Sequence, residues 1–459
     1  MQMPASQTLP WRGWLRVAAV TGLGLLGACM ETTRLPPGAD SGSTPSIAKP
    51  VKSLLPTVHI APATGWPSGR MPLATSGLQV SAFARELSHP RWLIALPNGD
   101  VLVAESNAPP RPAQSQGLKG LAMKWFQKRA GAGVPSANRI TLLRDADGDG
   151  SAEVRSVLLS GLNSPFGMAL VGDQLFVAHT DAVVAYAYTA GVTRIDAASG
   201  RRLTELPAGD RNHHWTKALV ASPDGTKLYA TVGSNSNVAE HGMAEEEGRA
   251  AIWEIDIASG RKRLFATGLR NPNGMAWTAD GVLWTVVNER DELGSDLVPD
   301  YLTSVRDGGF YGWPYSYFGQ HVDSRVKPAR PDLVAKALVP DFALGSHVAP
   351  LGLVASGSSA LTDALGVPTP ASAVFTQVGM FVGNHGSWNR RPHAGYNVVF
   401  VRFDGHRPVG KPVEVLGGFV NADGKAMGRP VGVAIDSGGA LLVADDVGNT
   451  VWRVNGRAR

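Results

Sequence analysis

Hydrophobic and polar positions follow one phrase that recurs along the chain: a polar loop tip, a short apolar run, a turn, a second apolar run and a polar exit. Two apolar runs separated by a Gly-containing turn predict a β-hairpin. The phrase is complete in residues 211–237, where two histidines open the loop tip and Ser-Pro-Asp-Gly forms the turn. Further copies begin near Pro90, Ser164, Asn271, Pro350 and Arg429; the copy at Pro350 is the loosest and resumes at Gly379.

These six copies recur at roughly 50 to 80 residues, a spacing typical of repeated small antiparallel sheets. One such sheet cannot bury both of its faces alone, so the repeat predicts an all-β fold, a six-bladed β-propeller over residues 78–459. Residues 107–138 form an insertion between the first two copies. In a propeller the repeated loop tips gather at one mouth of the central channel, so candidate chemistry is expected there.

The N-terminal residues do not belong to the repeat. Residues 1–28 contain two arginines, an apolar run and small residues, which is the layout of a secretory signal. Leu-Gly-Ala-Cys at 26–29 resembles a bacterial lipobox, and Cys29 is the only cysteine. We expect Cys29 to be acylated and to anchor the chain on the periplasmic side of a membrane, with the outer membrane favoured by Met30. A plain signal peptide is the alternative. Residues 29–77 are rich in Pro, Ser, Thr and Gly and predict a flexible tether.

Within the insertion, one set of apolar residues has helical spacing. The set comprises Leu118, Leu121, Ala122, Trp125 and Phe126, and several lysines lie off that face. A basic amphipathic helix of this kind either rests on a membrane surface or packs on the propeller with a solvated basic face. The sequence favours packing on the propeller.

Charge excludes one class of partner. The formal charge of +5 falls to +3 when Arg12 and Arg16 leave with the signal segment, and no concentrated basic run is present. We therefore expect no nucleic-acid partner.

An acidic turn is a candidate for a separate structural calcium site. Asp145, Asp147 and Asp149 alternate with small residues, which lets three carboxylates converge on one cation. The twelfth position of an EF-hand loop would be Ser156 instead of Glu, so the motif is not a full EF-hand, although Glu153 offers a further oxygen. A solvated turn without metal is the alternative.

Several repeat openings carry residues suited to chemistry at the mouth. His214 opens the third copy, and a neutral imidazole there is suited to act as a general base, although a packing or surface role for either His213 or His214 is the alternative. Arg270 opens the fourth copy and Arg429 the sixth, and guanidinium groups bind carboxylates or polarised carbonyls. The oxygen-rich run at 287–292 is suited to a hard cation.

Three blocks together resemble a known family. They are His214 with Leu219, Pro223-Asp-Gly and Tyr229; Leu269-Arg-Asn-Pro-x-Gly; and Gly308-Gly-Phe-Tyr-Gly-Trp-Pro. In combination they resemble the quinoprotein sugar dehydrogenases, the soluble glucose and sorbosone dehydrogenase group, which use pyrroloquinoline quinone (PQQ). Gly383-Asn-His-Gly-Ser-Trp-Asn-Arg390 resembles the sorbosone branch more closely. The similarity runs from about residue 80 to the C-terminus.

The resemblance implies a six-bladed propeller whose mouth holds PQQ and Ca²⁺. By position, His214 resembles the base that takes the substrate hydroxyl proton. Arg270 and Asn271 match quinone contacts, and Arg429 matches an arginine that pairs with a quinone carboxylate. Backbone carbonyls that bind calcium in the family fall near Glu289 and Arg290. Electrons are then expected to pass to a cytochrome or quinone acceptor.

Two departures from the family pattern concern the site. The aspartate that orients the family's histidine is replaced by Ser234, for which Asp210 or a neighbouring loop is a candidate substitute. The quinone-binding lysine has no clear counterpart, and Arg390 or Arg391 is the proposed replacement. We therefore expect an oxidoreductase acting on an aldose or related aldehyde sugar. The alternatives are a non-catalytic binding propeller and a calcium-dependent sugar-lactone hydrolase.

Overall fold

The computed structural model describes residues 31–51, 57–110, 128–357, 359–366 and 377–456. The expected signal segment, Cys29 and the apolar helical face beginning at Leu118 lie outside the described residues. Those predictions therefore stay predictions.

Six antiparallel sheets follow one another along the chain and form the blades of a β-propeller. Blade 1 contains β3 (Pro90–Ala95), β4 (Val101–Glu105), β5 (Arg139–Arg144) and β6 (Val154–Ser160). Blade 2 contains β7 (Met168–Val171), β8 (Gln174–Ala178), β9 (Ala182–Ala187) and β10 (Arg201–Glu205). Blade 3 contains β11 (Leu219–Ala221), β12 (Lys227–Val232), β13 (Ala251–Asp256) and β14 (Lys262–Thr267), with β18 (Gly309–Phe310) added in parallel.

The last three blades complete the set. Blade 4 contains β15 (Asn271–Trp277), β16 (Leu283–Asn288), β17 (Pro299–Ser304) and β21 (Phe342–Ser346). Blade 5 contains β22 (Pro350–Gly357), β23 (Gln377–Asn384), β24 (Asn397–Asp404) and β26 (Val413–Gly417), with β1 (Leu73–Ala74) at its edge and β25 (Arg407–Pro408) paired to β24. Blade 6 contains β27 (Pro430–Ile435), β28 (Leu441–Asp445), β29 (Thr450–Gly456) and β2 (Leu78–Ala84).

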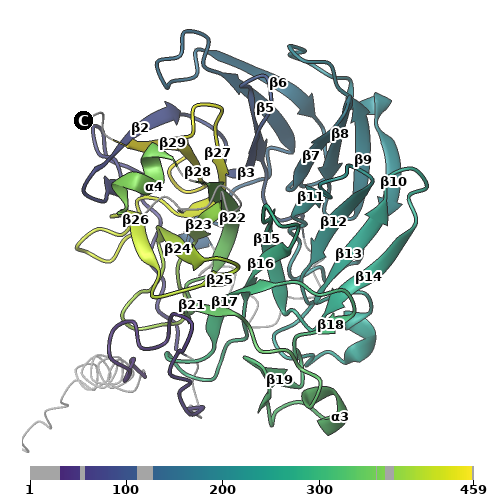
Figure 1. The fold of residues 1–459 in the computed structure, drawn as a ribbon, viewed down its shortest axis with the longest axis vertical. Coiled ribbons are helices and arrows are strands. Elements are labelled where there is room, and N and C mark those ends of the chain that lie inside the picture. Colours follow the sequence, from purple (N-terminus) through teal and green to yellow (C-terminus); the bar gives the residue numbers. More distant parts are fainter. Residues whose placement is uncertain (1–30, 52–56, 111–127, 358, 367–376, 457–459) are drawn as a thin grey trace, which may run out of the picture.

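The first strand of each blade lies at the centre of the ring and the last lies at the rim (Figure 1). Inner strands of consecutive blades contact one another, including β27 of blade 6 and β3 of blade 1. The ring is closed by β2, which precedes blade 1 in the chain but pairs with β29, from Leu78 opposite Gly456 to Ala84 opposite Val451. The six-bladed propeller predicted from the repeat is thus confirmed.

Four copies of the repeat carry a glycine in the inner strand or directly before it, because the backbone of the neighbouring blade comes close at that position. A Cβ at Gly352 would lie 2.2 Å from the Val431 carbonyl oxygen, and one at Gly274 would lie 2.5 Å from the Leu353 nitrogen. Gly167 makes the same kind of approach to blade 3, and Gly432 a looser one to blade 1. Inner strands converge toward the axis, so the backbones of neighbouring blades meet where a side chain would not fit.

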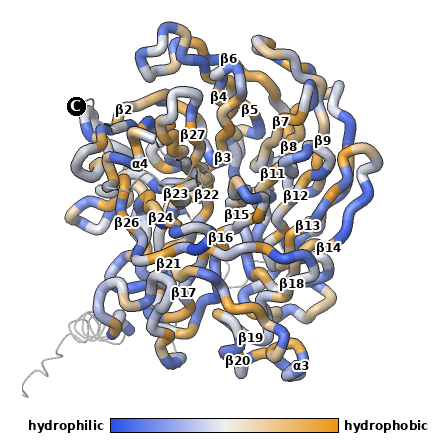
Figure 2. The backbone as a smooth tube through the Cα atoms, viewed as in Figure 1, coloured by the Kyte–Doolittle hydropathy of each residue, from blue (hydrophilic) through white to orange (hydrophobic). Residues whose placement is uncertain are grey.

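Apolar side chains fill the spaces between blades. Many strand segments are hydrophobic, and many loops at the rim are hydrophilic (Figure 2). β4 and β28 are buried along their whole length because each is covered by a neighbouring blade on both faces. Burial on both faces therefore accounts for apolar runs in place of strict alternation.

The antiparallel order of each blade places two sets of loops on the same face of the ring. These are the loops that precede the inner strands and the loops between the second and third strands. We call this face the mouth. The remaining turns, including the acidic turn between β5 and β6, lie on the opposite face.

Residues 31–51 and 57–77 form an N-terminal strap along the propeller, where the sequence predicted a flexible tether. Gly42 bridges Ala343 in β21, and β1 extends blade 5 by pairing with β26. The Asp40 carboxylate is buried against Arg390. A segment rich in Pro and Gly is thus ordered because its backbone hydrogen bonds and one buried charge are satisfied by the propeller, a pairing that composition does not reveal.

A few short elements complete the described chain. They are the hairpin of β19 (Ser316–Tyr317) and β20 (His321–Val322), the helices α3 (Pro331–Val334) and α4 (Ala360–Ala364), and the 3₁₀ helices η2 (Ala197–Ser199) and η3 (Met243–Glu246). No helix among the described residues has the length and apolar content needed to cross a bilayer.

Candidate active site

His214 lies in the loop before β11, and its ring is fixed by the loop after β12. Nδ1 lies 2.7 Å from the Ser234 carbonyl oxygen and 3.2 Å from Ser234 Oγ. Ser234 Oγ itself donates to the Ser236 carbonyl, so toward His214 it is an acceptor. Both contacts therefore require the proton on Nδ1, which leaves Nε2 as the basic nitrogen.

The pKa of His214 lies well below its usual value. Burial is the largest cause, and the nearby His213 and Arg270 add to it, while the hydrogen bond to Ser234 opposes them. Because no carboxylate of the described residues is paired with the ring, the imidazole is neutral over the physiological range. Asp210, a candidate substitute for the missing aspartate, is exposed to solvent.

The loop carrying His214 is anchored by two basic side chains, those of Arg249 and Lys217. Arg249 donates to the His214 carbonyl oxygen and to Asn212, and Lys217, which is fully buried, donates to the carbonyls of His214 and Trp215. Burial lowers the pKa of Lys217 well below its ordinary value, and Arg249 adds to the effect. These contacts fix the backbone from which the imidazole projects.

Gly233 brings His214 next to Asn271. A Cβ at Gly233 would lie 2.2 Å from Asn271 Oδ1 and 2.6 Å from His214 Cβ, so the two side chains flank a residue that must be glycine. Asn271 Oδ1 is buried and accepts no hydrogen bond from the described residues. An unsatisfied buried acceptor beside the base is suited to a ligand donor or a cation.

Arg270 precedes Asn271 and is held in place by the loops after β12 and β16. Its guanidinium donates to the Glu289 carbonyl oxygen, lies 3.1 Å from Asn237 Oδ1 and forms an ion pair of 3.1 Å with Asp291. The Arg270 carbonyl accepts from Ser234 N at 2.7 Å. The structure therefore places the predicted His214, Arg270 and Asn271 together at one side of the mouth.

Asp291 links Arg270 to blade 5. Its carboxylate accepts from Asn389 Nδ2 at 2.8 Å and lies 3.6 Å from His347 Nδ1. Burial alone would raise the pKa of Asp291, but Arg270 and His347 outweigh it and lower the pKa to about 2. Asn389 Oδ1 and Glu289 Oε1 are also buried acceptors without a donor in the described part of the chain.

Glu289 and Arg290 have different surroundings. The Arg290 side chain is fully buried and donates to the carbonyls of Pro314 and Ser316, and it pairs with Glu289 and Asp323. It therefore holds the Gly-Gly-Phe-Tyr-Gly-Trp-Pro segment and the β19 hairpin against the mouth. The Glu289 carbonyl points to Arg270 Nη1, and Glu289 N donates to Asp300, whose pKa burial raises to about 7.

Arg429 lies in the loop before β27, on the side of the mouth formed by blades 5 and 6. Its guanidinium donates to the carbonyls of Ala61 and His385, and it lies 4.8 Å from the Tyr396 ring centroid. It has no carboxylate within ion-pairing distance among the described residues, and its Nε is buried without an acceptor there. A buried guanidinium without a counter-ion is suited to an anionic ligand.

A second group of charged residues surrounds Asp446, in the loop after β28. Asp446 pairs with Arg91 at 2.5 Å and His385 at 2.9 Å, and it lies 3.6 Å from His89. Burial alone would raise the pKa of Asp446, but these basic neighbours, His385 first, outweigh it and lower the pKa. Burial lowers the pKa of His385 to about 4.

Arg390 points away from these groups. Its guanidinium pairs with Asp40 of the strap at 2.8 Å, donates to the Ser346 carbonyl and lies 3.9 Å from Asp296. The structure therefore shows Arg390 holding the strap on blades 4 and 5, where the sequence proposed a quinone contact.

The family described as TrAA12-like matches residues 135–300 and 332–457, more than half of the chain. The chain belongs to the TrAA12-like family. The matched residues include His214, Arg270, Asn271 and Arg429. A curated relative, an uncharacterised protein of Borreliella burgdorferi, is 25% identical over 253 residues. That match covers 54% of this chain and 62% of the relative, so the chain spans about three-fifths of the length of the relative it matches.

Solved structures share the fold of this TrAA12-like chain. The calcium structure of an enzyme of carbohydrate-active family AA12 from Trichoderma reesei has a TM-score of 0.66, 18% identity and coverage of 88% of this chain and all of that one. The holo form of the PQQ domain of a pyranose dehydrogenase from Coprinopsis cinerea has a TM-score of 0.65, 19% identity and coverage of 86% and 100%. The PQQ-bound aldose sugar dehydrogenase from Streptomyces coelicolor has a TM-score of 0.53, 15% identity and coverage of 84% and 99%. The resemblance to PQQ-dependent sugar dehydrogenases is thus confirmed at the level of the fold.

The side chains at the mouth fit an anionic cofactor bound with a hard cation. Nε of Arg429 and of Arg91 are buried donors without acceptors among the described residues, and one side-chain oxygen each of Asn271 and Asn389 is a buried acceptor without a donor there. Carboxylates satisfy the first set, and calcium or a donor hydroxyl satisfies the second.

No cluster of metal-binding side chains lies at the mouth within the described part of the chain. The group of at least three His, Cys, Asp or Glu residues found there is the turn of Asp145, Asp147, Asp149 and Glu153 on the opposite face, whose ligand atoms lie within 4.8 Å of one another. Calcium coordination at the mouth would therefore depend on backbone carbonyls and amide oxygens. Of the two carbonyls that the sequence proposed, the one of Glu289 already accepts a hydrogen bond from Arg270.

Sequence reasoning missed four parts of the site: Asp291, Asn389, His347 and the group around Asp446. Asp291 was visible as part of an oxygen-rich run, but its pairing with Arg270 depends on two loops meeting in space. Asp446 stands in the polar exit of the sixth copy, so its position in the repeat indicated the mouth. No local pattern identified the three basic partners of Asp446.

Proposed function

We propose that this chain is a sugar oxidoreductase that oxidises an aldose or related aldehyde sugar, of the glucose or sorbosone type, with PQQ and Ca²⁺ held at the mouth. The observation that carries the proposal is His214, whose Nδ1 is fixed by a carbonyl so that a neutral, basic Nε2 stands beside Arg270 and Asn271. The AA12 enzyme, the pyranose dehydrogenase and the aldose sugar dehydrogenase, whose fold this chain shares, support the same substrate class.

His214 acts as the general base in this proposal. Oxidation of a sugar hydroxyl removes its proton and, from the same carbon, a hydride. Nε2 takes the proton, and Nδ1–H remains bound to the Ser234 carbonyl throughout, so the ring keeps its orientation while its charge changes. The low pKa keeps the ring neutral before the reaction, and it makes the imidazolium that forms a stronger acid than an ordinary one.

Arg270, Asn271 and Arg429 hold and polarise the cofactor. When bound, PQQ supplies a two-electron hydride acceptor and Ca²⁺ supplies Lewis-acid stabilisation of its reduced form. Arg429 would pair with a cofactor carboxylate, for which it has no competing partner among the described residues. Asp291 fixes the Arg270 guanidinium, so its direction does not depend on the ligand.

The electron acceptor and the location are proposed from the sequence alone. We propose that electrons pass to a cytochrome or quinone, and that an acyl chain on Cys29 anchors the protein on the periplasmic side of a bacterial membrane, with the outer membrane favoured. The lipobox-like run supports the anchor.

The test is reconstitution of the purified protein with PQQ and Ca²⁺, followed by dye reduction with a panel of aldoses. His214→Asn keeps a donor to the Ser234 carbonyl but removes the basic nitrogen, so kcat should fall by about 10²-fold or more while PQQ binding, read from its absorbance spectrum, is retained. His213→Asn is the matched control on the exposed neighbour, and it should retain the parent kcat.

Each outcome separates the proposal from its alternatives. Equal activity of His214→Asn and the parent would remove His214 from the mechanism. PQQ that fails to bind would favour the non-catalytic propeller. Lactone hydrolysis without any redox acceptor would favour the hydrolase, although the mouth lacks the carboxylate cluster expected for that chemistry within the described residues.

A further inference from the structure

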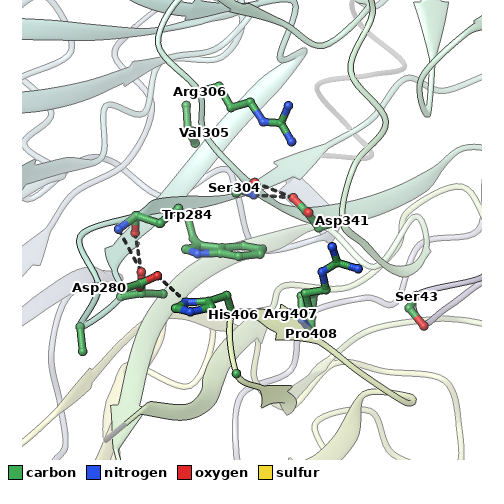
Figure 3. Close-up of a pocket in the computed structure, with 14 residues that line it drawn as sticks. Ser43, Asp280, Trp284, Ser304, Val305, Arg306, Asp341, His406, Arg407 and Pro408 are labelled. Carbon is green, nitrogen blue, oxygen red and sulfur yellow. Dashed lines mark hydrogen bonds and ion pairs between the residues drawn. The ribbon is translucent and has the colours of Figure 1, made fainter. Parts of the chain in front are cut away.

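A large pocket opens on the face opposite the mouth, between blades 4 and 5 (Figure 3). Its volume is about 970 Å³, and it is formed by the β15–β16 turn, the end of β17, the approach to β21 and the β24–β25 turn. The volume is at the upper end of the range for small-molecule sites, about 300 to 1,000 Å³. The mechanism above uses none of its residues.

The floor of the pocket contains a buried donor without an acceptor. Trp284 is 3% exposed, and its indole packs edge-on against Phe403 at 5.0 Å between ring centroids. Its Nε1 is buried and has no hydrogen-bond partner among the described residues. An indole N–H left unpaired in a pocket wall carries a desolvation cost that no acceptor among the described residues offsets.

The rim carries basic and acidic side chains close together. Arg306 and Arg407 project from opposite sides (Figure 3), and neither has an ion-pair partner in the described part of the chain. Asp341 lies between them, oriented by hydrogen bonds to one oxygen from Thr303 and Ser304. Asp280 pairs with His406 at 2.5 Å.

The presence of both arginine and aspartate side chains at the rim favours one class of ligand. A simple anion would be repelled by Asp280 and Asp341, and a simple cation would be repelled by Arg306 and Arg407. Vicinal hydroxyl groups both donate and accept, so they match planar carboxylate and guanidinium groups standing side by side. Buried Val305 and Pro408 add apolar lining for C–H surfaces.

We propose that this pocket is a second saccharide-binding site that takes an oligosaccharide segment and is separate from the reacting centre. Binding at this pocket depends on its own lining residues and does not require turnover at the mouth. Binding on the far face would hold the enzyme on a glycan while the mouth stays open to monosaccharide.

In the experiment, the full-length His214→Asn protein is titrated with cellotriose and, separately, with maltotriose. Binding is measured by calorimetry and by tryptophan fluorescence. Binding of at least one trisaccharide is expected. The Arg306→Gln/Arg407→Gln double variant should weaken its Kd by about ten-fold or more, because charge-assisted hydrogen bonds are lost. Arg402→Gln, an exposed arginine on β24 outside the pocket, is the matched control and should leave Kd unchanged.

A further readout is turnover of monosaccharides at the mouth. When the two arginine substitutions are made in protein that retains His214, kcat/KM for monosaccharides should equal that of the unsubstituted protein. This result would separate the pocket from the mouth. The proposal is overturned if neither trisaccharide binds, if the double variant binds as tightly as its parent, or if inorganic phosphate displaces the sugar, which would indicate an anion site. Absence of dye reduction in the parent would count against the proposed function and not against this pocket.

Discussion

The basic nitrogen of His214 is set by one main-chain carbonyl. In the resembled family an aspartate orients the histidine and can stabilise its charged form, whereas Ser234 offers a carbonyl and a hydroxyl that accept Nδ1–H without negative charge. The carbonyl fixes the tautomer as well as a carboxylate would. It does not offset the burial that lowers the pKa of the ring.

Ser234→Asp should raise the pKa of His214. A carboxylate beside Nδ1 favours imidazolium, so the acidic limb of the kcat/KM profile should move up by about one pH unit or more. In the parent the pKa is depressed, so the neutral base persists below pH 6.5, the usual value, and activity is lost only at lower pH. The measurement is the pH dependence of dye reduction.

Ser234→Ala is the control for that variant. It keeps the main-chain carbonyl and removes only the hydroxyl, so its acidic limb should coincide with that of the parent. A folded Ser234→Asp protein with an unmoved limb would show that the limb reports a different group, and His385, with a pKa of about 4, would be the next to test.

At this scale the sequence predicted the residues that a motif carries. His214, Arg270 and Asn271 were predicted together and lie together. Arg390 was predicted as a cofactor contact to replace the family's lysine, which has no counterpart here, but the direction of its side chain is decided by Asp40, some 350 positions earlier. A pairing over that separation has no local signature.

Among the elements, the inner strands are the most constrained. Gly352→Ala should destabilise the propeller, because the new Cβ would lie 2.2 Å from the Val431 carbonyl oxygen and the backbones of β22 and β27 would have to separate. We expect a loss of about 1–3 kcal/mol in the free energy of unfolding, measured with urea, as for overpacked cores.

Gly438→Ala provides the comparison. Its Cβ would meet only ordinary contacts at 3.4 Å, and Gly438 does not have a positive φ, so the free energy of unfolding should stay close to that of the parent. Equal stability of both variants would contradict the view that glycine in the repeat exists for blade-to-blade contact.

The acidic turn between β5 and β6 is a separate element with its own prediction. Its four carboxylates converge within 4.8 Å, so Ca²⁺ should raise Tm through this turn as well as through the mouth. Asp147→Asn should reduce the increase in Tm caused by Ca²⁺ and leave PQQ-dependent activity unchanged. An unaltered increase in Asp147→Asn would mean that this turn is a solvated one.

The hairpin phrase predicted the blades because each hairpin is a local structure read from adjacent runs. The outermost strands were less visible. β2 belongs to the last blade although it comes before the first, and β18 joins blade 3 after an excursion through blade 4. Register between segments far apart in sequence is set by closure of the ring, which no window of residues encodes.

At the scale of the whole molecule, the N-terminal strap begins against the mouth of the ring. Glu31 accepts a hydrogen bond from Ser295 N, and Thr33 N donates to the Arg391 carbonyl. Both partners lie in mouth loops, between the second and third strands of blades 4 and 5. The described chain therefore begins on the face that carries His214.

This start point has a consequence for a protein anchored through Cys29. Two residues span at most about 7 Å, so an acylated Cys29 would hold the mouth close to the bilayer and toward a membrane-bound electron acceptor.

In lipidated protein bound to vesicles, a fluorophore on Met243→Cys, an exposed mouth position, should be quenched by headgroup quenchers more strongly than one on Asp173→Cys, in an exposed turn of the opposite face. Acylation blocks Cys29, so each variant takes a single label. Quenching that is equal, or stronger at residue 173, would place the mouth away from the membrane, and electrons would then have to leave through a soluble carrier.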